Sequence, residues 1–236
     1  MCSQLAVRSF TELEPSINPN YLSDSYAYHF QQTLKDSKPF PHFSLTNFID
    51  NEEFVQMVRS ELLNMEYSLV TTDLYSNYQT FDIESSPPPY LPSIVKLRDF
   101  FKTKVREWLS SISGVELTTR VSIVSTIYEH TQILLPHDDQ LDNRAFAYVY
   151  YLTPQWKPNY GGELALFDNV NNYPRREPLS NSLALFRVSP ASWHMVKEKC
   201  DFFRLSVHGW FYEPKVTSIL RLPPPARNPL LNSVKV

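Results

Sequence analysis

Residues 128–139 read Y-E-H-T-Q-I-L-L-P-H-D-D, and the end of this stretch decides how the rest of the chain is interpreted. His137 and Asp139 are two residues apart, and residues two apart in an extended strand point to the same side. Their imidazole and carboxylate would therefore face one point in space. Two histidines and one carboxylate form the triad that is typical of non-haem Fe(II). We predict that His194, on a later strand, is the third ligand.

A second informative strand is F-F-R-L-S-V-H-G-W at residues 202–210. Its alternate residues form an apolar face, and the opposite face carries Arg204, Ser206 and His208. An arginine inside a strand is rarely buried without a partner, and its planar guanidinium suits a bidentate carboxylate. We predict that Arg204 binds the distal carboxylate of a dicarboxylate ligand beside the Ser206 hydroxyl. A salt bridge to an acid of the protein is the alternative, and His208 is expected to support the site or lie at the surface.

The His137–Asp139 pair is a weak signal by itself. Among six histidines and 25 acidic residues, such a pair also occurs as an ordinary hydrogen-bonded surface pair. The order of features favours a site: HxD, an apolar strand, two glycines, a second apolar strand, a histidine and R-x-S. Two alternatives stay open. Zinc accepts the same ligands in hydrolases, although a hydrolase has no use for an inward Arg–Ser strand, and a non-enzymatic jelly-roll binding module could retain a silent site.

Composition bounds the class of protein. A chain of 236 residues can form one large domain with its own core. The net charge of −3 argues against a general nucleic-acid binder, so we expect no direct nucleic-acid binding. Cys2 and Cys200 cannot form a disulfide framework, which favours a reducing compartment. The sequence has no apolar leader and no run of membrane-spanning length, so we expect no membrane and a location in the cytoplasm or nucleus.

The first half of the chain reads as helical support. Residues 1–20 have no clear period and are expected to be a flexible lead-in. Residues 66–82 are ambiguous between strand and loop. Three helices are predicted: one over 24–35, which Asp24 can cap, one from a cap at Asp50 to about residue 65, and one from about 92 to 112 with Pro92 in its first turn. A strand is predicted over 42–49.

From Gly114 onward the pattern is that of strands. Several short strands at close spacing favour a sandwich or barrel. We predict an α+β fold with a double-stranded β-helix (jelly-roll) core over 114–214, helices over 21–113 packed on one sheet, and an extended Pro-rich tail over 215–236. The predicted strands cover about 115–130, 145–153, 162–168, 182–189 and 202–212.

The two faces of A-F-A-Y-V-Y-Y-L-T, residues 145–153, differ in size. The even positions are large and are expected to pack against a helix or a second sheet. The odd positions are small up to Tyr151, which leaves room for a ligand with a phenol at its edge. An ordinary half-exposed tyrosine is the alternative interpretation.

Taken together, these motifs resemble the 2-oxoglutarate- and Fe(II)-dependent oxygenases. Over roughly residues 20–214 the sequence looks like the eukaryotic prolyl hydroxylases that modify a small-subunit ribosomal protein. The motifs that carry this resemblance are D-L-Y at 73–75, W-L-S-S-I at 108–112, Y-E at 128–129, L-L-P-H-D-D at 134–139, Y-L-T-P-Q-W at 151–156, G-G-E-L at 161–164, V-S-P-A-S-W-H at 188–194, R-L-S at 204–206 and G-W-F at 209–211.

The resemblance implies an enzyme that uses Fe(2+), 2-oxoglutarate, O2 and L-ascorbate as reductant, and that produces succinate and CO2. Its substrate would be a prolyl residue of a small-subunit ribosomal protein, hydroxylated at C3; another protein or a small molecule is the alternative. Full-length members of that family carry a second, catalytically silent domain, whereas this sequence ends soon after the first module. The implied site residues are His137, Asp139 and His194 for the metal and Tyr128, Tyr151, Arg204 and Ser206 for 2-oxoglutarate.

Overall fold

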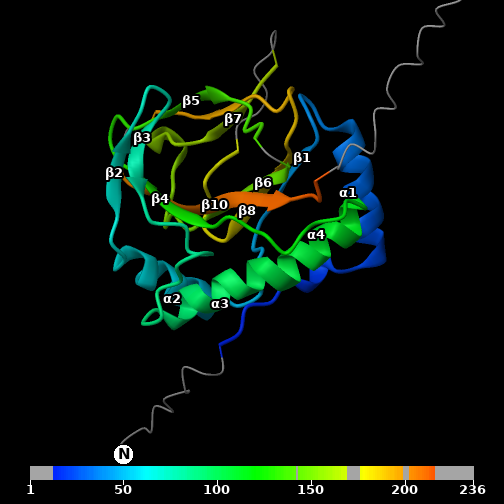
Figure 1. Cartoon of the computed structure of the whole chain (residues 1–236), viewed down its shortest axis with the longest axis horizontal. Helices are drawn as coiled ribbons and strands as arrows, with labels where there is room; N and C mark the ends of the chain where they lie inside the picture. The colour runs from blue at the N-terminus through cyan, green and yellow to red at the C-terminus, as the bar shows by residue number, and fades with distance from the viewer. Residues whose placement is uncertain (1–12, 142, 169–175, 199–201, 216–236) are drawn as a thin grey trace, which may run out of the picture.

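Two antiparallel sheets face each other, and helices cover the outer face of the larger sheet (Figure 1). The computed structural model describes residues 13–141, 143–168, 176–198 and 202–215. The larger sheet has the strand order β1-β8-β6-β10-β4-β3-β2, and the smaller has the order β5-β9-β7. The strands are β1 (His42–Leu45), β2 (Ser68–Thr71), β3 (Ser76–Gln79), β4 (Val124–Tyr128), β5 (Leu134–His137), β6 (Arg144–Tyr151), β7 (Leu164–Leu166), β8 (Ser182–Arg187), β9 (His194–Val196) and β10 (Arg204–Tyr212).

The predicted helices are present, with small differences at their ends. The long predicted helix is continuous in direction but contains a π-helical turn, η2, between α3 and α4. The predicted caps are each wrong by one residue, because Ser23 and Asn51, not Asp24 and Asp50, accept the first backbone N–H groups. The helical elements are η1 (Pro19–Tyr21), α1 (Asp24–Asp36), α2 (Glu52–Leu63), α3 (Pro92–Phe100), η2 (Phe101–Val105), α4 (Arg106–Ser113) and η3 (Pro158–Tyr160).

Strand β6 separates two hydrophobic cores, as its alternation predicts. Its large even-numbered side chains pack in the core beneath the helices, where the rings of Tyr148 and Phe101 stack with centroids 4.8 Å apart. Its odd-numbered residues Ala147 and Tyr151 lie in the core between the two sheets. The fold is therefore the predicted α+β jelly roll with its N-terminal helices packed on one sheet.

The strand prediction fails mainly in the short elements. Only β4 and an isolated bridge at Val121 replace the strand predicted over 115–130. The Ser122 backbone instead crosses β10 so closely that a Cβ on Gly209 would lie 1.7 Å from the Ser122 carbonyl oxygen. The bounds of β5 and β9 are not predicted, because these strands have only four and three residues and β5 contains a proline. Residues left ambiguous over 66–82 form the β2–β3 hairpin.

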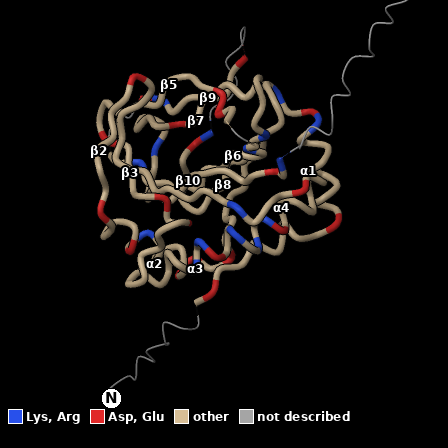
Figure 2. The backbone as a smooth tube through the Cα atoms, in the orientation of Figure 1, with Lys and Arg blue, Asp and Glu red and all other residues tan. Residues whose placement is uncertain are grey.

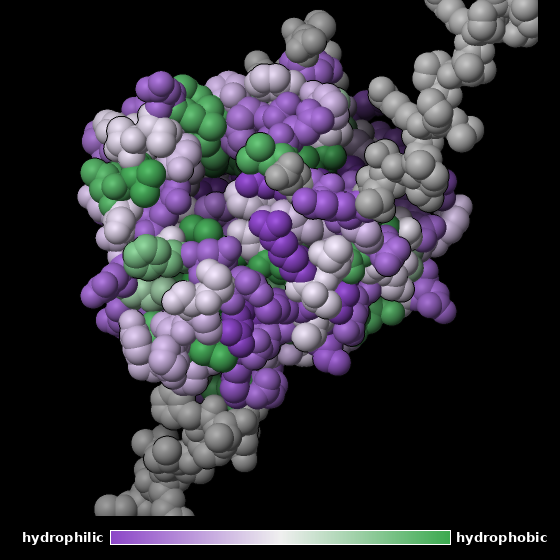
Figure 3. Space-filling model, in the orientation of Figure 1, coloured by the Kyte–Doolittle hydropathy of each residue, from purple (hydrophilic) through white to green (hydrophobic). Residues whose placement is uncertain are grey.

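Acidic and basic residues are mixed along the helices and strands in Figure 2. The face seen in Figure 3 is mainly hydrophilic, and its larger hydrophobic patches lie on the side of β2, β3 and β5. Among the described residues, no helix combines the length and the apolar character needed to cross a membrane. Most of the predicted lead-in, residues 1–12, and nearly all of the predicted tail lie outside the described residues.

Candidate active site

His137, Asp139 and His194 meet between the two sheets. One potential ligand atom from each residue lies within 4.8 Å of the other two. Asp139 Oδ1 is 3.5 Å from His137 Nε2, and Asp139 Oδ2 is 3.5 Å from His194 Nε2. The structure thus brings together the three residues that the sequence singles out, with their donor atoms converging on one point.

The two histidines are placed by strand register, but Asp139 is not. His137 ends β5, His194 begins β9, and the two residues are paired directly across this small sheet. Asp139 follows β5 in the left-handed region, with φ of 62°. The expectation that strand alternation aligns His137 with Asp139 is therefore wrong, because a tight turn returns the carboxylate toward the imidazole. The prediction that His194 lies on a later strand is confirmed, and His194 is the first residue of that strand.

Each histidine presents its Nε2 atom to this point. The Nδ1 atom of His137 lies 2.9 Å from the Leu135 carbonyl oxygen, and that of His194 lies 2.8 Å from the Ser192 carbonyl oxygen. A carbonyl only accepts, so each Nδ1 carries the proton and leaves the Nε2 lone pair available. This second hydrogen bond is the usual device that orients a metal-binding imidazole.

The electrostatics favour an ionised carboxylate beside the histidines. Burial acts to raise the pKa of Asp139, but hydrogen bonds and charge from His137 and His194 hold it far below its ordinary value. Burial acts to lower the pKa of His137, and Asp139 outweighs it, so that this pKa is raised. Two imidazole nitrogens and one carboxylate are a donor set that fits a divalent first-row metal.

A cavity of about 530 Å³ extends from these residues across the inner face of the larger sheet. The pairing of the strands determines which residues form the wall of this cavity. Tyr128 of β4 lies opposite Arg204 of β10, and in the next row Ser206 lies opposite Tyr151 of β6. Tyr128, Arg204 and Ser206 line the cavity, and Tyr151 packs directly beside Arg204.

Arg204 has the properties of a receptor for an anion. The side chain is 1% exposed, its Nη1 donates to Ser206 Oγ at 3.2 Å, and its Nε has no hydrogen-bond partner within the described ranges. Its guanidinium carbon lies 5.0 Å from the ring centroids of both Tyr128 and Tyr151. No described carboxylate pairs with it, which argues against the alternative of a salt bridge within the protein. A buried charge without a partner is costly, so this site fits a ligand carboxylate.

The two phenols remain neutral hydrogen-bond donors at physiological pH. Burial raises the pKa of Tyr128 to about 12, against the opposing charge of Arg204. Burial also raises the pKa of Tyr151, whose hydroxyl is buried and has no hydrogen-bond partner within the described ranges. Tyr151 is 1% exposed, so the interpretation as a half-exposed tyrosine is wrong.

Two further polar residues face the cavity. His208 lies one row beyond Ser206, is close to Thr126 with Nδ1 3.4 Å from its hydroxyl, and has its pKa lowered to about 4 by burial. Asn77 of β3 is 2% exposed. β3 pairs with β4, and the register of this pairing places Asn77 opposite Tyr128. The Asn77 amide interacts with the Tyr128 phenol, while its Oδ1 has no described partner.

Asn77 is absent from the site predicted from sequence. The ambiguity of residues 66–82 left its face undefined. The alternation in S-N-Y-Q at 76–79 is the signal that could have placed Asn77 and Gln79 on one face of a strand.

Comparison with known proteins agrees with this geometry. Residues 121–212 match the model of the 2OG-Fe(II) oxygenase superfamily. The Mus musculus protein named prolyl 3-hydroxylase OGFOD1 is 35% identical over 206 residues, which cover 82% of this chain and 37% of that protein. Its Xenopus laevis namesake is 38% identical over 218 residues, which cover 85% of this chain and 40% of that protein. The chain thus spans about two fifths of the length of these relatives.

Solved structures support the fold at low sequence identity. A Pseudomonas putida prolyl-4-hydroxylase has a TM-score of 0.63 and 17% identity, covering 78% of this chain and 99% of that one. A prolyl hydroxylase from Trichoplax adhaerens has a TM-score of 0.65 and 17% identity, and the match covers 79% of this chain and 90% of that one. The match over residues 121–212, the two relatives and the shared fold together place this chain in the 2OG-Fe(II) oxygenase superfamily.

Proposed function

We propose that the chain is an Fe(II)- and 2-oxoglutarate-dependent dioxygenase that hydroxylates a prolyl residue of a protein. The observation that carries this proposal is Arg204. Its buried guanidinium, which has no carboxylate partner among the described residues, opens on the same cavity as the two histidines and Asp139. A zinc hydrolase with these three ligands has no need of a carboxylate receptor there.

Different residues of the site would bind the metal and 2-oxoglutarate. His137, Asp139 and His194 would hold Fe(II), and Arg204 with Ser206, Tyr128 and Tyr151 would bind 2-oxoglutarate. When bound, the metal, 2-oxoglutarate and O2 supply the oxidising chemistry, with succinate and CO2 as products. We further propose L-ascorbate as the reductant that keeps the metal ferrous.

The protein's own part is to orient these groups and exclude water. The guanidinium offers a planar pair of donors to one carboxylate, and the neutral phenols add donors without adding charge. Asn77 lies beside Tyr128 in the β3–β4 register and acts to lower the pKa of its phenol. The Nδ1 bonds of the two histidines keep their Nε2 atoms directed at one point. No general base is required of the chain in this scheme.

A protein substrate is supported by the mouth of the cavity. Leu74 and Leu141 line it and are 37% and 64% exposed, and Leu69 and Leu135 nearby in the same part of the fold are 55% and 40% exposed. Exposed apolar groups gathered on one side of a protein commonly mark a protein-binding surface. Figure 3 shows hydrophobic patches on this side.

The relatives define the proposed substrate more closely. Both curated relatives are named prolyl 3-hydroxylases, and the Trichoplax adhaerens structure is a prolyl hydroxylase in complex with a peptide fragment of hypoxia inducible factor. We therefore propose hydroxylation at C3 of a prolyl residue. A proline of a small-subunit ribosomal protein, reached in the cytoplasm or nucleus, is the specific target proposed from the sequence resemblance.

The first experiment is an anaerobic titration with Fe(II) and then 2-oxoglutarate, followed through the weak visible charge-transfer band of the chelate. The band should appear in the wild type and be weaker in Arg204→Lys at equal 2-oxoglutarate concentration. Absence of the band in metal-loaded wild-type protein would refute the cofactor assignment.

Substrate identity needs a separate assay. Peptides of ribosomal proteins are incubated with enzyme, Fe(II), ascorbate and 2-oxoglutarate, and fragmentation spectra are searched for one added oxygen on proline. Turnover of 2-oxoglutarate with a small molecule, and none with protein or peptide, would leave the oxygenase chemistry in place and defeat the prolyl proposal. Such a result would favour the alternative substrate class.

A further inference from the structure

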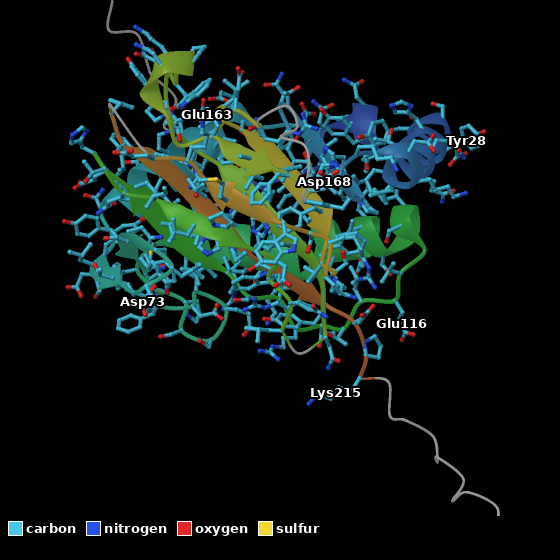
Figure 4. All side chains as sticks on the ribbon, turned by 90° about the horizontal axis from the view of Figure 1, so that it is seen from above. Tyr28, Asp73, Glu116, Glu163, Asp168 and Lys215 are labelled. Atoms are coloured by element: carbon cyan, nitrogen blue, oxygen red, sulfur yellow. The ribbon has the colours of Figure 1, made fainter. Side chains whose placement is uncertain are left out.

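A second cavity, of about 560 Å³, lies between α1 and the edge strand β1. It shares no lining residue with the cavity of the candidate active site. The two cavities are neighbours, because His42 in the second pairs with Phe186 in the first, and Arg176 in the second pairs with Leu164 in the first. Helix α1, which carries Tyr28, and the β2–β3 turn, which carries Asp73, lie at opposite ends of the view in Figure 4.

The lining of this second cavity is basic. Lys38 and Arg176 contribute cationic groups, His29 and His42 contribute imidazoles, and no aspartate or glutamate of the described residues lines it. Burial raises the pKa of Tyr26, which also lines the cavity, to about 12, so that this phenol stays a neutral donor. A cavity lined in this way attracts anions and has no carboxylate of its own to satisfy its cations.

Arg176 is the most informative of these residues. Its side chain is partly buried, its Nη2 bonds to His42 Nε2, and its Nε is buried without a hydrogen-bond partner within the described ranges. Burial lowers the pKa of Arg176, and among the described residues the Tyr151 phenol acts in the opposite direction. A partly buried guanidinium that has no carboxylate partner among the described residues fits an anion from outside.

His42 orients this guanidinium without neutralising it. His42 is 5% exposed, and its Nδ1 lies 2.8 Å from the Phe40 carbonyl oxygen. Nδ1 therefore carries the proton, and Nε2 accepts from Arg176. Burial and then the Arg176 charge keep the pKa of His42 below its ordinary value, so the ring is neutral. The full positive charge of Arg176 remains available.

The edge of β1 adds a backbone donor. β1 is the end strand of the larger sheet, so one side of its backbone has no neighbouring strand among the described residues. The His42 N–H on that side donates to Ser37 Oγ at 3.0 Å, and the Thr46 carbonyl accepts from the Tyr21 hydroxyl at 2.6 Å. Because backbone groups alternate along a strand, Ser44 between them points its N–H to the same side, where its residue lines the cavity.

We propose that this second cavity is a binding site for a phosphate-type oxyanion, held by Arg176 and Lys38 with the Ser44 N–H as a neutral donor. Two cations and no acid in the wall match a dianion better than a single carboxylate. The phosphoryl group could be inorganic phosphate or belong to a phosphorylated serine of a peptide. The proposal does not depend on the oxygenase chemistry.

The test is calorimetric titration of the whole chain with inorganic phosphate and, separately, with a short phosphoserine peptide and its unphosphorylated form. We expect saturable binding of phosphate or of the phosphopeptide, and which of the two binds identifies the source of the phosphoryl group. Arg176→Gln should weaken binding at least about tenfold, and Lys38→Gln should weaken it less because Lys38 is at the exposed rim. Lys35→Gln is the matched control, since Lys35 is exposed and lies outside the lining.

Arg176→Lys keeps the charge but loses the planar fork, and an intermediate affinity is expected if the guanidinium binds the anion. Thermal unfolding of each variant checks that it is folded. The proposal is overturned if neither ligand binds the wild type, or if Arg176→Gln binds phosphate as well as the wild type does. Weaker 2-oxoglutarate binding by Arg176→Gln with unchanged phosphate binding would also overturn it, because Arg176 would then serve the active site.

Discussion

The candidate active site has two parts, which lie on different sheets and which we call the metal half and the anion half. The metal half uses β5 and β9, short strands of a three-stranded sheet, and takes its carboxylate from Asp139 in a left-handed turn. The anion half lies on the seven-stranded sheet, where long strands hold its residues in aligned rows. The metal half comprises His137, Asp139 and His194, and the anion half comprises Tyr128, Tyr151, Arg204 and Ser206.

This difference separates two ways of building a binding site. Rows on a wide sheet are fixed by the register of every strand, so one residue change alters one contact. A centre made from a turn and two short strands depends on all three donors at once. Each single substitution in the anion half should therefore remove part of the affinity for 2-oxoglutarate, whereas a single substitution in the metal half should remove nearly all of the affinity for the metal.

The largest effect is expected for Asp139→Ala. The change removes the only carboxylate within the candidate ligand set. Changes to residues that merely support a ligand cost about 10- to 100-fold in metal affinity, so loss of the ligand itself should exceed that range. Fe(II) or Co(II) titration of the apoprotein measures it, with circular dichroism to show that the fold is kept.

Asp138→Ala is the matched control for this prediction. Asp138 is the neighbouring acid, its Oδ1 accepts from the Gln140 N–H at 3.1 Å, and it lies outside the ligand set. Its loss should leave metal affinity nearly unchanged. If both variants bind metal as the wild type does, Asp139 is not a ligand and the metal half is misassigned.

The next effect is expected for Arg204→Lys. Truncating one member of a buried charge pair costs about 2–5 kcal/mol, and lysine should cost less because it keeps the charge. Lysine lacks the planar fork, so 2-oxoglutarate affinity should still fall clearly while metal affinity stays close to that of the wild type. Equilibrium titration of both ligands measures the two affinities. A parallel fall in metal affinity would abolish the distinction between the two halves.

The faces of the anion half follow from the sequence for a physical reason. In β6 and β10 the alternation of large, small and polar side chains follows the strand period over eight and nine residues. The faces of Arg204, Ser206 and Tyr151 can therefore be assigned from the sequence alone. The core follows from the same alternation, because the large even-numbered residues of β6 meet the helices.

The three residues of the metal half can be singled out from the sequence, but their geometry cannot be derived from it. Nothing in H-D-D predicts that Asp139 adopts a positive φ, since aspartate does so only occasionally. β9 has three residues, which is too short for a pattern to appear. Asn77 was missed because β3 has only four residues and its pairing with β4 is long-range.

A smaller effect concerns His208, which lines the cavity between the two halves. Burial lowers its pKa to about 4, whereas the unfolded chain should have about 6.5. Between these values the unfolded state binds the proton and the folded state does not, so stability falls as pH drops from 6.5 to 4. The full loss amounts to about 3 kcal/mol and levels off below pH 4.

His208→Gln removes this titration. The difference in unfolding free energy between wild type and variant, measured by urea denaturation at a series of pH values, should narrow or reverse as the pH falls. This difference cancels the contributions of His137 and Asp139, which are common to both proteins. A constant difference from pH 7 to pH 4 would show that His208 titrates alike in the folded and unfolded chains.

The smallest effect is expected for Asn77, and it tests whether this residue increases the affinity of the anion half for 2-oxoglutarate. The Asn77 side chain lies beside Tyr128 in the β3–β4 register and acts to lower the pKa of the phenol, as a donor would. A phenol oxygen that accepts from the Asn77 amide keeps its own proton free to point at a ligand carboxylate. Asn77→Asp has nearly the same shape but replaces the donor with an acceptor. Tyr128 would donate to the new carboxylate instead, and 2-oxoglutarate affinity should fall by about tenfold, or about 1.4 kcal/mol.

A double-mutant cycle with Tyr128→Phe separates this role from simple packing. In the Tyr128→Phe background no hydroxyl remains to be turned, so Asn77→Asp should cost clearly less than in the wild type. Asn77→Leu gives the packing baseline. Lowering the pH should restore part of the affinity of Asn77→Asp, because a protonated carboxyl can again donate to the phenol. Equal costs in both backgrounds would show that Asn77 does not act through Tyr128, and the anion half would then end at the row of Arg204.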